Sequence, residues 1–202
     1  MVTNNEKHKI NFKDKRTLME FVHALAKAVK AKDKYTENHS EMMSRIAVDL
    51  AKCLNLPESE VETVRLGAML HDLGKIGIKE SILLKPGKLT KEEYKMIKQH
   101  PQIGAEIVRT VHALKNAIPL ILYHHERYDG TGYLEGLKGE EIPIGARIIG
   151  IADVYHALRS DRPYRKAYSK EKALEIIKEG ADKQFDPKIV DIFLDLAKNN
   201  PL

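Results

Sequence analysis

Residues 60–75, EVETVRLGAMLHDLGK, decide how the rest of the sequence is interpreted. The part from Glu60 to Leu70 is expected to be a helix, because Pro57 and Ser59 precede it and Gly74 follows it. His71 and Asp72 then stand near the C-terminal end of that helix. A metal-ligating pair at a helix end directs attention to the other histidines and aspartates of the chain.

Histidine and aspartate recur on or beside other helix-like stretches. Five of the nine histidines and two aspartates form this set: His39, His71, Asp72, His100, His124, His125 and Asp153. Imidazole and carboxylate are ligands that divalent transition metals prefer, and seven exceed what one tetrahedral site uses. The leading hypothesis is a two-metal hydrolytic centre in which Asp72 spans both metals and a bridging hydroxide attacks phosphorus.

Each member of this set also has a simpler interpretation. His39 alone would more often be a hydrogen-bonded core or surface histidine, and an aspartate beside a histidine can serve only to orient its ring, as Asp72 would orient His71. The pair His124–His125 at a helix end is equally typical of a surface pair at the negative pole of a helix. These interpretations do not explain why all the groups occur in one small domain.

The remaining pattern predicts an all-α fold. Apolar spacing indicates a helix from Leu18 to Val29, and Thr36 can cap another that carries His39. Thr90 and Glu93 form a capping box that opens a helix toward His100. Gly and Pro residues predict a loop over 74–89 and a turn-rich excursion over 129–139.

Helices are also expected at 116–125, from Pro143 to Asp153, from Ser169 to Gly180 and after Asp186. No strand-like alternation, repeat or low-complexity tract competes with them. The expected organisation is a flexible lead over 1–14 and one helical domain over 15–200.

The totals fit one globular domain of 202 residues with 43% apolar content. The longest apolar runs fall short of a membrane span, and the charged N-terminus is unlike a signal peptide, so we expect a cytoplasmic protein and no membrane partner. The net charge of +5 arises from intermingled charges, which argues against a DNA or RNA polymer as partner. Cys53, the only cysteine, is expected to be a buried thiol.

Longer strings resemble a known family. His71–Asp72 with Gly74–Lys75 matches the signature of the HD superfamily of metal-dependent phosphohydrolases, and the rest is similar to its HD-GYP branch. The supporting strings are YTENHS, HDLGKIGIKESILLKPGKLT, KMIKQHPQIGAEIV, HHERYDGTGYLEGLKGEEIP, ARIIGIADVYHALRSDRPYRKA and GADKQFDP. They run in the family's order from about Tyr35 to Pro187.

The resemblance implies an all-helical domain with paired metals, commonly iron or manganese, that hydrolyses the bacterial second messenger cyclic di-GMP. It implies His39, His71, Asp72, His100, His124, His125 and Asp153 as metal ligands, with Asp72 bridging. Zinc, nickel or cobalt would also suit these ligands. Tyr35 stands where some relatives with a third metal carry glutamate, which favours two metals.

The same resemblance implies substrate contacts. Lys75 and Arg162 stand at positions that contact phosphate, and Arg165 stands where a lysine is common. Lys75 is expected to act in catalysis as well, beside Asp72. Either Tyr133 or Tyr164 is expected to pack on guanine. For each basic residue the simpler interpretation is a surface cation, and for each tyrosine it is simple packing.

Two positions depart from the family pattern. Its GYP tripeptide is Gly132–Tyr133–Leu134 here, a change expected to affect loop stiffness or partner contacts more than metal binding. An aspartate usual in the family is replaced by His156, on the helical face of Asp153. His156 is open to three roles, as an additional ligand or substrate contact, a proton shuttle, or a substitute that weakens catalysis.

The function implied is hydrolysis of cyclic di-GMP to linear pGpG, with a second cut to GMP left open. One alternative is a phosphohydrolase for another nucleotide or a mixed cyclic dinucleotide, because metals and lysine recognise phosphate rather than base. Another is a weakly active binding module that signals through the 129–142 loop. A homodimer or a signalling partner at that loop also stays open.

Overall fold

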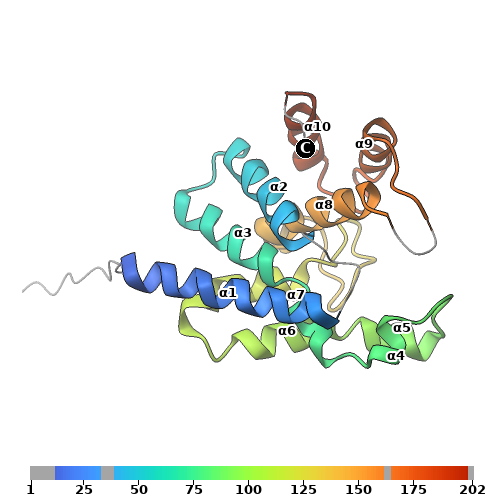
Figure 1. Ribbon diagram of the computed structural model, residues 1–202. Helices are drawn as coiled ribbons and strands as arrows, with labels where there is room; N and C mark the ends of the chain where they lie inside the picture. Colours follow the sequence, from blue (N-terminus) through green and yellow to red (C-terminus); the bar gives the residue numbers. More distant parts are fainter. Residues whose placement is uncertain (1–11, 33–38, 162–164, 200–202) are drawn as a thin grey trace, which may run out of the picture.

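The computed structural model describes residues 12–32, 39–161 and 165–199, and these residues fold as helices joined by turns and loops (Figure 1). The predicted all-α class is confirmed, since no strand occurs in these ranges. The expected lead over 1–14 stays a prediction, because 1–11 lie outside the described residues and α1 begins at Phe12. No described helix is long and apolar enough to cross a bilayer.

The elements follow one another along the chain in this order: α1 Phe12–Lys32, α2 His39–Cys53, α3 Glu58–Leu70, η1 Leu73–Gly77, α4 Glu80–Leu83, α5 Lys91–Ile97, α6 His100–Val108, η2 His112–Ala117, α7 Ile118–Tyr123, η3 Gly139–Glu141, α8 Ile144–Arg159, α9 Lys170–Glu179 and α10 Pro187–Asn199. The η elements are short 3₁₀ turns.

Two hydrophobic cores lie on either side of α3. One joins α2, α3, α8, α9 and α10, and α3 contributes Val61, Val64 and Ala68 to it. The other joins α1, α3, η1, α6 and α7, and Leu66 and Leu70 face it from α3. Helix α7 is shared in the same way, because Leu120 belongs to the first core and Ile121 to the second. The C-terminal ends of α3 and α7 are therefore held from two sides.

Local sequence signals account for several helix starts. The Thr90 hydroxyl accepts the Glu93 amide and the Glu93 carboxylate accepts the Thr90 amide, so the predicted capping box opens α5. The Ser169 hydroxyl accepts the Lys172 amide at the start of α9, as its cap position predicted. Pro143 directly precedes α8.

The segment over 74–89, expected to be a loop, contains short helical elements that the glycine and proline pattern did not predict. Residues 73–77 form η1 and residues 80–83 form α4. Leu73 and Ile78 are buried, and their apolar side chains tie this segment to the bundle. The first part of the segment is thus fixed by packing, which the glycine, proline and lysine pattern does not reveal.

The expectation of a buried Cys53 thiol was wrong. Cys53 is exposed at the end of α2, whereas Ala51 is fully buried. Two residues separate the side chains by about 200° around a helix, so a core position at 51 turns position 53 outward.

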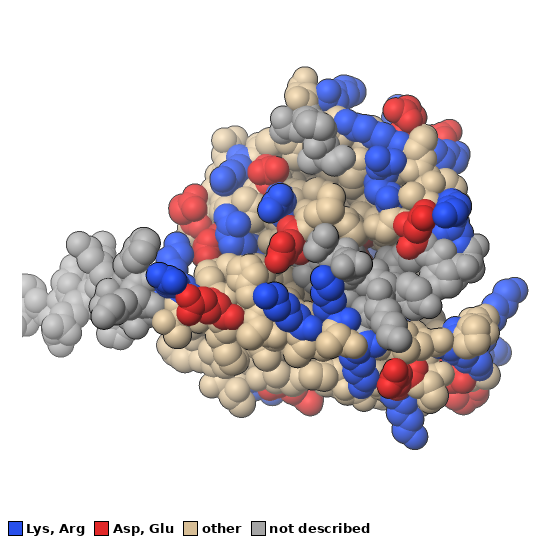
Figure 2. All heavy atoms as spheres, in the orientation of Figure 1, with Lys and Arg blue, Asp and Glu red and all other residues tan. Residues whose placement is uncertain are grey.

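Charged side chains are interspersed on the face shown in Figure 2, and basic residues do not form one continuous field there. This mixed surface agrees with the sequence, in which 34 basic and 29 acidic residues are intermingled.

Gly74 permits the close approach of η1 to α6. A Cβ atom at position 74 would lie 1.8 Å from the His100 carbonyl oxygen and 2.5 Å from the Gly104 amide nitrogen. Both neighbours are backbone atoms, which cannot move without moving α6. The glycine therefore sets the distance between the Asp72–Lys75 turn and His100.

We expect Gly74→Ala to destabilise the fold by about 2–3 kcal/mol through forced separation of η1 and α6. Gly77→Ala is the matched control within the same turn, because its Cβ would meet only the Ile103 side chain, at 3.0 Å. Urea unfolding monitored by circular dichroism measures both. Equal stability of the two variants would contradict the close-approach argument.

Candidate metal centre

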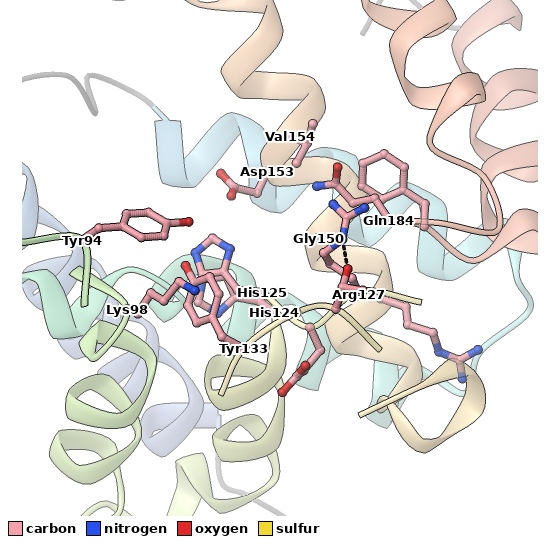
Figure 3. A pocket seen from close by; sticks show the side chains of 15 residues that line it. Tyr94, Lys98, His124, His125, Arg127, Tyr133, Gly150, Asp153, Val154 and Gln184 are labelled. Atoms are coloured by element: carbon pink, nitrogen blue, oxygen red, sulfur yellow. Dashed lines mark hydrogen bonds between the residues drawn. The ribbon is translucent and has the colours of Figure 1, made fainter. Parts of the chain in front are cut away.

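Imidazole and carboxylate side chains from three helix ends and from one helix face lie near one another. His71 and Asp72 follow α3, His124 and His125 follow α7, and His100 opens α6. Asp153 points from α8 toward His125 across a cavity (Figure 3). His71, His100 and His124 are each no more than 2% exposed, so these rings sit inside the domain rather than on its surface.

Three of these histidines are oriented by the same hydrogen bond. The Nδ1 atom of each ring lies 2.7–2.8 Å from the backbone carbonyl oxygen three residues earlier: His71 to Ala68, His100 to Ile97 and His124 to Ile121. A carbonyl oxygen only accepts, so Nδ1 carries the proton and donates. The Nε2 atom of each neutral ring is then left with a lone pair for another partner.

Those Nε2 atoms converge. His100 Nε2 lies 3.4 Å from His124 Nε2 and 3.4 Å from Asp72 Oδ1. His71 Nε2 lies 3.3 Å from Asp72 Oδ2, the other carboxylate oxygen. Lone pairs that face one another and a carboxylate repel unless a positive charge lies among them. The donor set thus has the chemistry of a cation site.

The potential ligand atoms fall into two overlapping groups. One contains His100, His124 and His125, and the other contains His71, Asp72 and His124; within each group the atoms lie within 4.8 Å of one another. Asp153 Oδ1 is 3.9 Å from His71 Nε2, beside the second group. These groups of imidazole nitrogens and carboxylate oxygens are candidate positions for a metal ion.

The protonation states suit metal binding. Burial, together with neighbouring His125, holds the pKa of His124 well below its usual range, and burial lowers the pKa of His125 to about 4. Both rings are therefore neutral at physiological pH, the form in which imidazole binds metals. Burial raises the pKa of Asp72, but Lys75 and His71 outweigh it, so the pKa stays well below normal and the carboxylate is ionised.

His71 differs from the other rings. Burial lowers its pKa, but the Asp72 and Asp153 carboxylates outweigh this effect, and the net pKa is raised. The negative charge of the two aspartates is thus directed at the His71 side of the site, where a cation would be favoured most.

Lys75 lies at this site, with Nζ 2.8 Å from Asp72 Oδ2.

His156 is buried on α8, and its Nδ1 atom is 3.3 Å from the Ser160 hydroxyl. That hydroxyl donates its only proton to the His156 carbonyl, so Nδ1 donates to the hydroxyl oxygen and Nε2 carries the lone pair.

Arg165 occupies the C-terminal end of α8. Its guanidinium donates to the carbonyl oxygens of Ala157 and Leu158 and stacks on the Tyr168 ring, with 4.4 Å from Cζ to the ring centroid. The guanidinium therefore closes this helix end in the described conformation. The expected phosphate contact of Arg165 stays a prediction.

Three expected site residues have no described side chain. His39 begins α2 but its side chain is not described, and Arg162 and Tyr164 lie outside the described residues. Their roles stay predictions from the resemblance.

Tyr133 packs against the histidine cluster. Its ring stacks on the His125 ring with a centroid distance of 4.9 Å, and burial raises its pKa, so it is a neutral phenol at physiological pH. Stacking on His125 makes Tyr133 a wall of the cavity beside the expected ligands (Figure 3). Its expected contact with guanine stays a prediction.

Glu126 is a structural residue that the sequence interpretation missed. Its buried carboxylate accepts the amides of Glu135 and Gly136, at 2.7 and 3.0 Å, and ties the Tyr133 loop to the end of α7. The available signal was an acidic residue directly after His124–His125 and before a glycine-rich loop. Tyr94 and Lys98, which also line the cavity, were missed as well.

The cavity beside the cluster has a volume of about 370 Å³. His124, His125 and Asp153 line one part of it, and Tyr133 and Lys98 line another. A volume of this size falls in the range of sites that hold small molecules. The molecule thus combines an all-helical bundle, a buried cation site and an adjacent substrate-sized cavity, which together define a candidate metallohydrolase.

Comparison with known proteins agrees with this class. The model of the HD domain family matches residues 23–189. The chain is 44% identical over 172 residues to the cyclic di-GMP phosphodiesterase response regulator RpfG of Xanthomonas campestris, covering 84% of this chain and 46% of that protein. It is 47% identical over 146 residues to a cyclic di-GMP phosphodiesterase of Vibrio cholerae, covering 69% and 30%.

A solved structure shares the fold. The cyclic GMP-AMP specific phosphodiesterase V-cGAP3 of V. cholerae superimposes with a TM-score of 0.73 at 21% identity, over 90% of this chain and 49% of that one. The chain spans less than half the length of these three relatives.

This chain belongs to the HD domain family. The resemblance to HD-GYP phosphodiesterases is confirmed by the two cyclic di-GMP phosphodiesterases named above. Phosphohydrolases of the HD family depend on metals, which agrees with the cation site described here.

We expect Glu126→Ala to release the Tyr133 loop, because the Glu135 and Gly136 amides lose their charged acceptor. Their hydrogen exchange should accelerate about tenfold or more. Glu126→Gln keeps one acceptor oxygen and should restore most of the protection. Identical exchange in wild type and Glu126→Ala would show that the carboxylate does not hold the loop.

Proposed function

We propose that this domain is a metal-dependent phosphodiesterase that hydrolyses cyclic di-GMP to linear pGpG. The observation that carries the proposal is the convergence of the His100 and His124 Nε2 atoms on each other and on Asp72. The names of the two relatives with at least 44% identity supply the substrate, and the cation site supplies the means of hydrolysis. A second cut to GMP remains open within the proposal.

Two divalent transition metals, iron or manganese foremost, would be held by the seven expected ligands: His39, His71, Asp72, His100, His124, His125 and Asp153. When bound, such metals supply the Lewis acidity that polarises a phosphodiester and acidifies water. The neutral rings of His124 and His125 and the ionised Asp72 present donor atoms without prior loss of a proton. Asp72, with one oxygen near His71 and one near His100, is the proposed bridge.

The other site residues would act on the substrate itself. Lys75 places its ammonium beside Asp72, where it can neutralise a non-bridging phosphate oxygen. Arg162 and Arg165 are proposed as further phosphate contacts from the resemblance, and Tyr133 as a guanine contact. His156, one helical turn beyond Asp153, is proposed to face the substrate from α8.

The location and partners complete the proposal. We infer a cytoplasmic enzyme, where cyclic dinucleotides act as messengers. A homodimer or signalling partner at the 129–142 loop remains an open part of the proposal.

Asp72→Ala tests the proposed bridge. We expect the helical fold to persist and hydrolysis of cyclic di-GMP to fall at least about hundredfold. Anaerobic loading with iron or manganese, followed by chromatography of products from several cyclic and linear nucleotides, measures the loss and the base preference. His112→Ala, an exposed histidine in η2, is the control. Wild-type turnover in metal-loaded Asp72→Ala would refute the bridge.

Elemental analysis of the loaded protein tests the stoichiometry. We expect two metals per chain, because the described donor atoms form two adjacent groups. His124→Ala should reduce this number, since His124 belongs to both groups. Three metals per chain would contradict the proposal.

A further inference from the structure

Three cationic side chains line the cavity next to the candidate metal centre: Lys98, Arg127 and Arg147. Arg127 is paired with Asp129 at 3.3 Å, and Arg147 is paired with buried Asp186. Lys98 has no carboxylate at ion-pair distance among the described residues. Lys75, next to Asp72, is already paired with that carboxylate. Lys98 is thus the cavity-lining cation whose charge remains available to an anion.

The Lys98 ammonium is held by aromatic rings instead of a carboxylate. Its Nζ atom lies 4.9 Å from the centroid of the Tyr94 ring and 4.9 Å from that of the Tyr133 ring. Cation–π contacts restrict where the ammonium lies but do not neutralise it. The lysine is therefore kept in place and remains fully charged.

Helix α5 has no buried residue and is fixed at its start by the Thr90–Glu93 capping box and by Lys85, which donates to Glu93. Tyr94 and Lys98 are four residues apart, so they share one face of this helix and its end. Both point toward the cavity in Figure 3, although Tyr94 is 49% exposed. The exposed Tyr94 ring therefore contributes to the lining of the cavity and not to the hydrophobic core.

Lys98 lies at the cavity beside the expected ligands (Figure 3). The centroid of the Tyr133 ring is 4.9 Å from Lys98 Nζ and 4.9 Å from the centroid of the His125 ring. Lys98 therefore contacts the ring that stacks on an expected ligand. A cyclic dinucleotide carries two phosphodiesters in one ring, so a substrate with one phosphodiester at the ligands presents the other nearby.

We propose that Lys98 binds the non-scissile phosphodiester of the cyclic dinucleotide, with Tyr94 and Tyr133 holding the ammonium in position. The inference rests on the proposed function and adds a residue that recognises the distal half of the substrate. It makes Lys98 a determinant of substrate binding, and Tyr94 a positioning residue for it.

The test compares two substrates in Lys98→Met, Lys98→Arg and the control Lys95→Met, an exposed lysine of the same helix. Cyclic di-GMP has a distal phosphodiester, and bis(p-nitrophenyl) phosphate has a single phosphodiester. We expect Lys98→Met to raise the KM for cyclic di-GMP about tenfold with little change in kcat. The ratio of kcat/KM for cyclic di-GMP to that for bis(p-nitrophenyl) phosphate should fall by the same factor.

Lys98→Arg should recover most of this ratio because it keeps the charge, and Lys95→Met should match wild type. Tyr94→Ala should raise the KM for cyclic di-GMP in the same direction, and Tyr94→Phe should not. An unchanged ratio in Lys98→Met, or an equal loss on both substrates, would overturn the inference while leaving the proposed function standing. Wild-type protein that cleaves bis(p-nitrophenyl) phosphate but not cyclic di-GMP would refute the proposed substrate, and this inference with it.

Discussion

The hydrogen bond from an imidazole Nδ1 atom to a carbonyl oxygen three residues earlier is the interaction on which the candidate centre depends. Carbonyls in the last turn of a helix lack an amide partner further along the chain. Ala68 and Ile121 lie in the last turns of α3 and α7, and Ile97 is the last residue of α5. Each carbonyl is satisfied by a histidine that follows it. The helix ends thus fix the tautomer and direct each Nε2 atom toward Asp72.

This orientation is useful only if the helix ends keep their places, and the two cores ensure that they do. Apolar residues of α3 and α7 enter both cores, so neither helix can rotate without opening one of them. Gly74 then lets the Asp72 turn approach the backbone of His100. This packing keeps the imidazole lone pairs and the Asp72 carboxylate close together although they repel one another. A bound cation would relieve that repulsion and stabilise the folded domain.

Much of this arrangement could be predicted where the signal is local. The capping residues Thr90 and Ser169 open helices, and His71–Asp72 stand at a helix end, as the sequence indicated. Local patterns failed where packing between distant segments decides. Leu73 and Ile78 turn an expected loop into ordered structure, and Cys53 faces outward because the core takes the opposite side of α2, at Ala51. Lys98 contacts Tyr133, which lies far from it in the sequence, and no periodic pattern predicts that contact.

The expected metal ligands are buried, whereas the residues proposed to recognise the substrate lie at the rim of the cavity. The expected ligands His71, His100 and His124 are buried between the cores, where a substitution disturbs packing as well as metal binding. Helix α5 buries no residue, so Tyr94 and Lys98 can be replaced at little cost to the fold. A bundle arranged in this way can change what it binds on α5 while the candidate metal centre stays the same. The physical basis is that recognition at the rim depends on exposed side chains, whereas the centre depends on helix ends fixed by two cores.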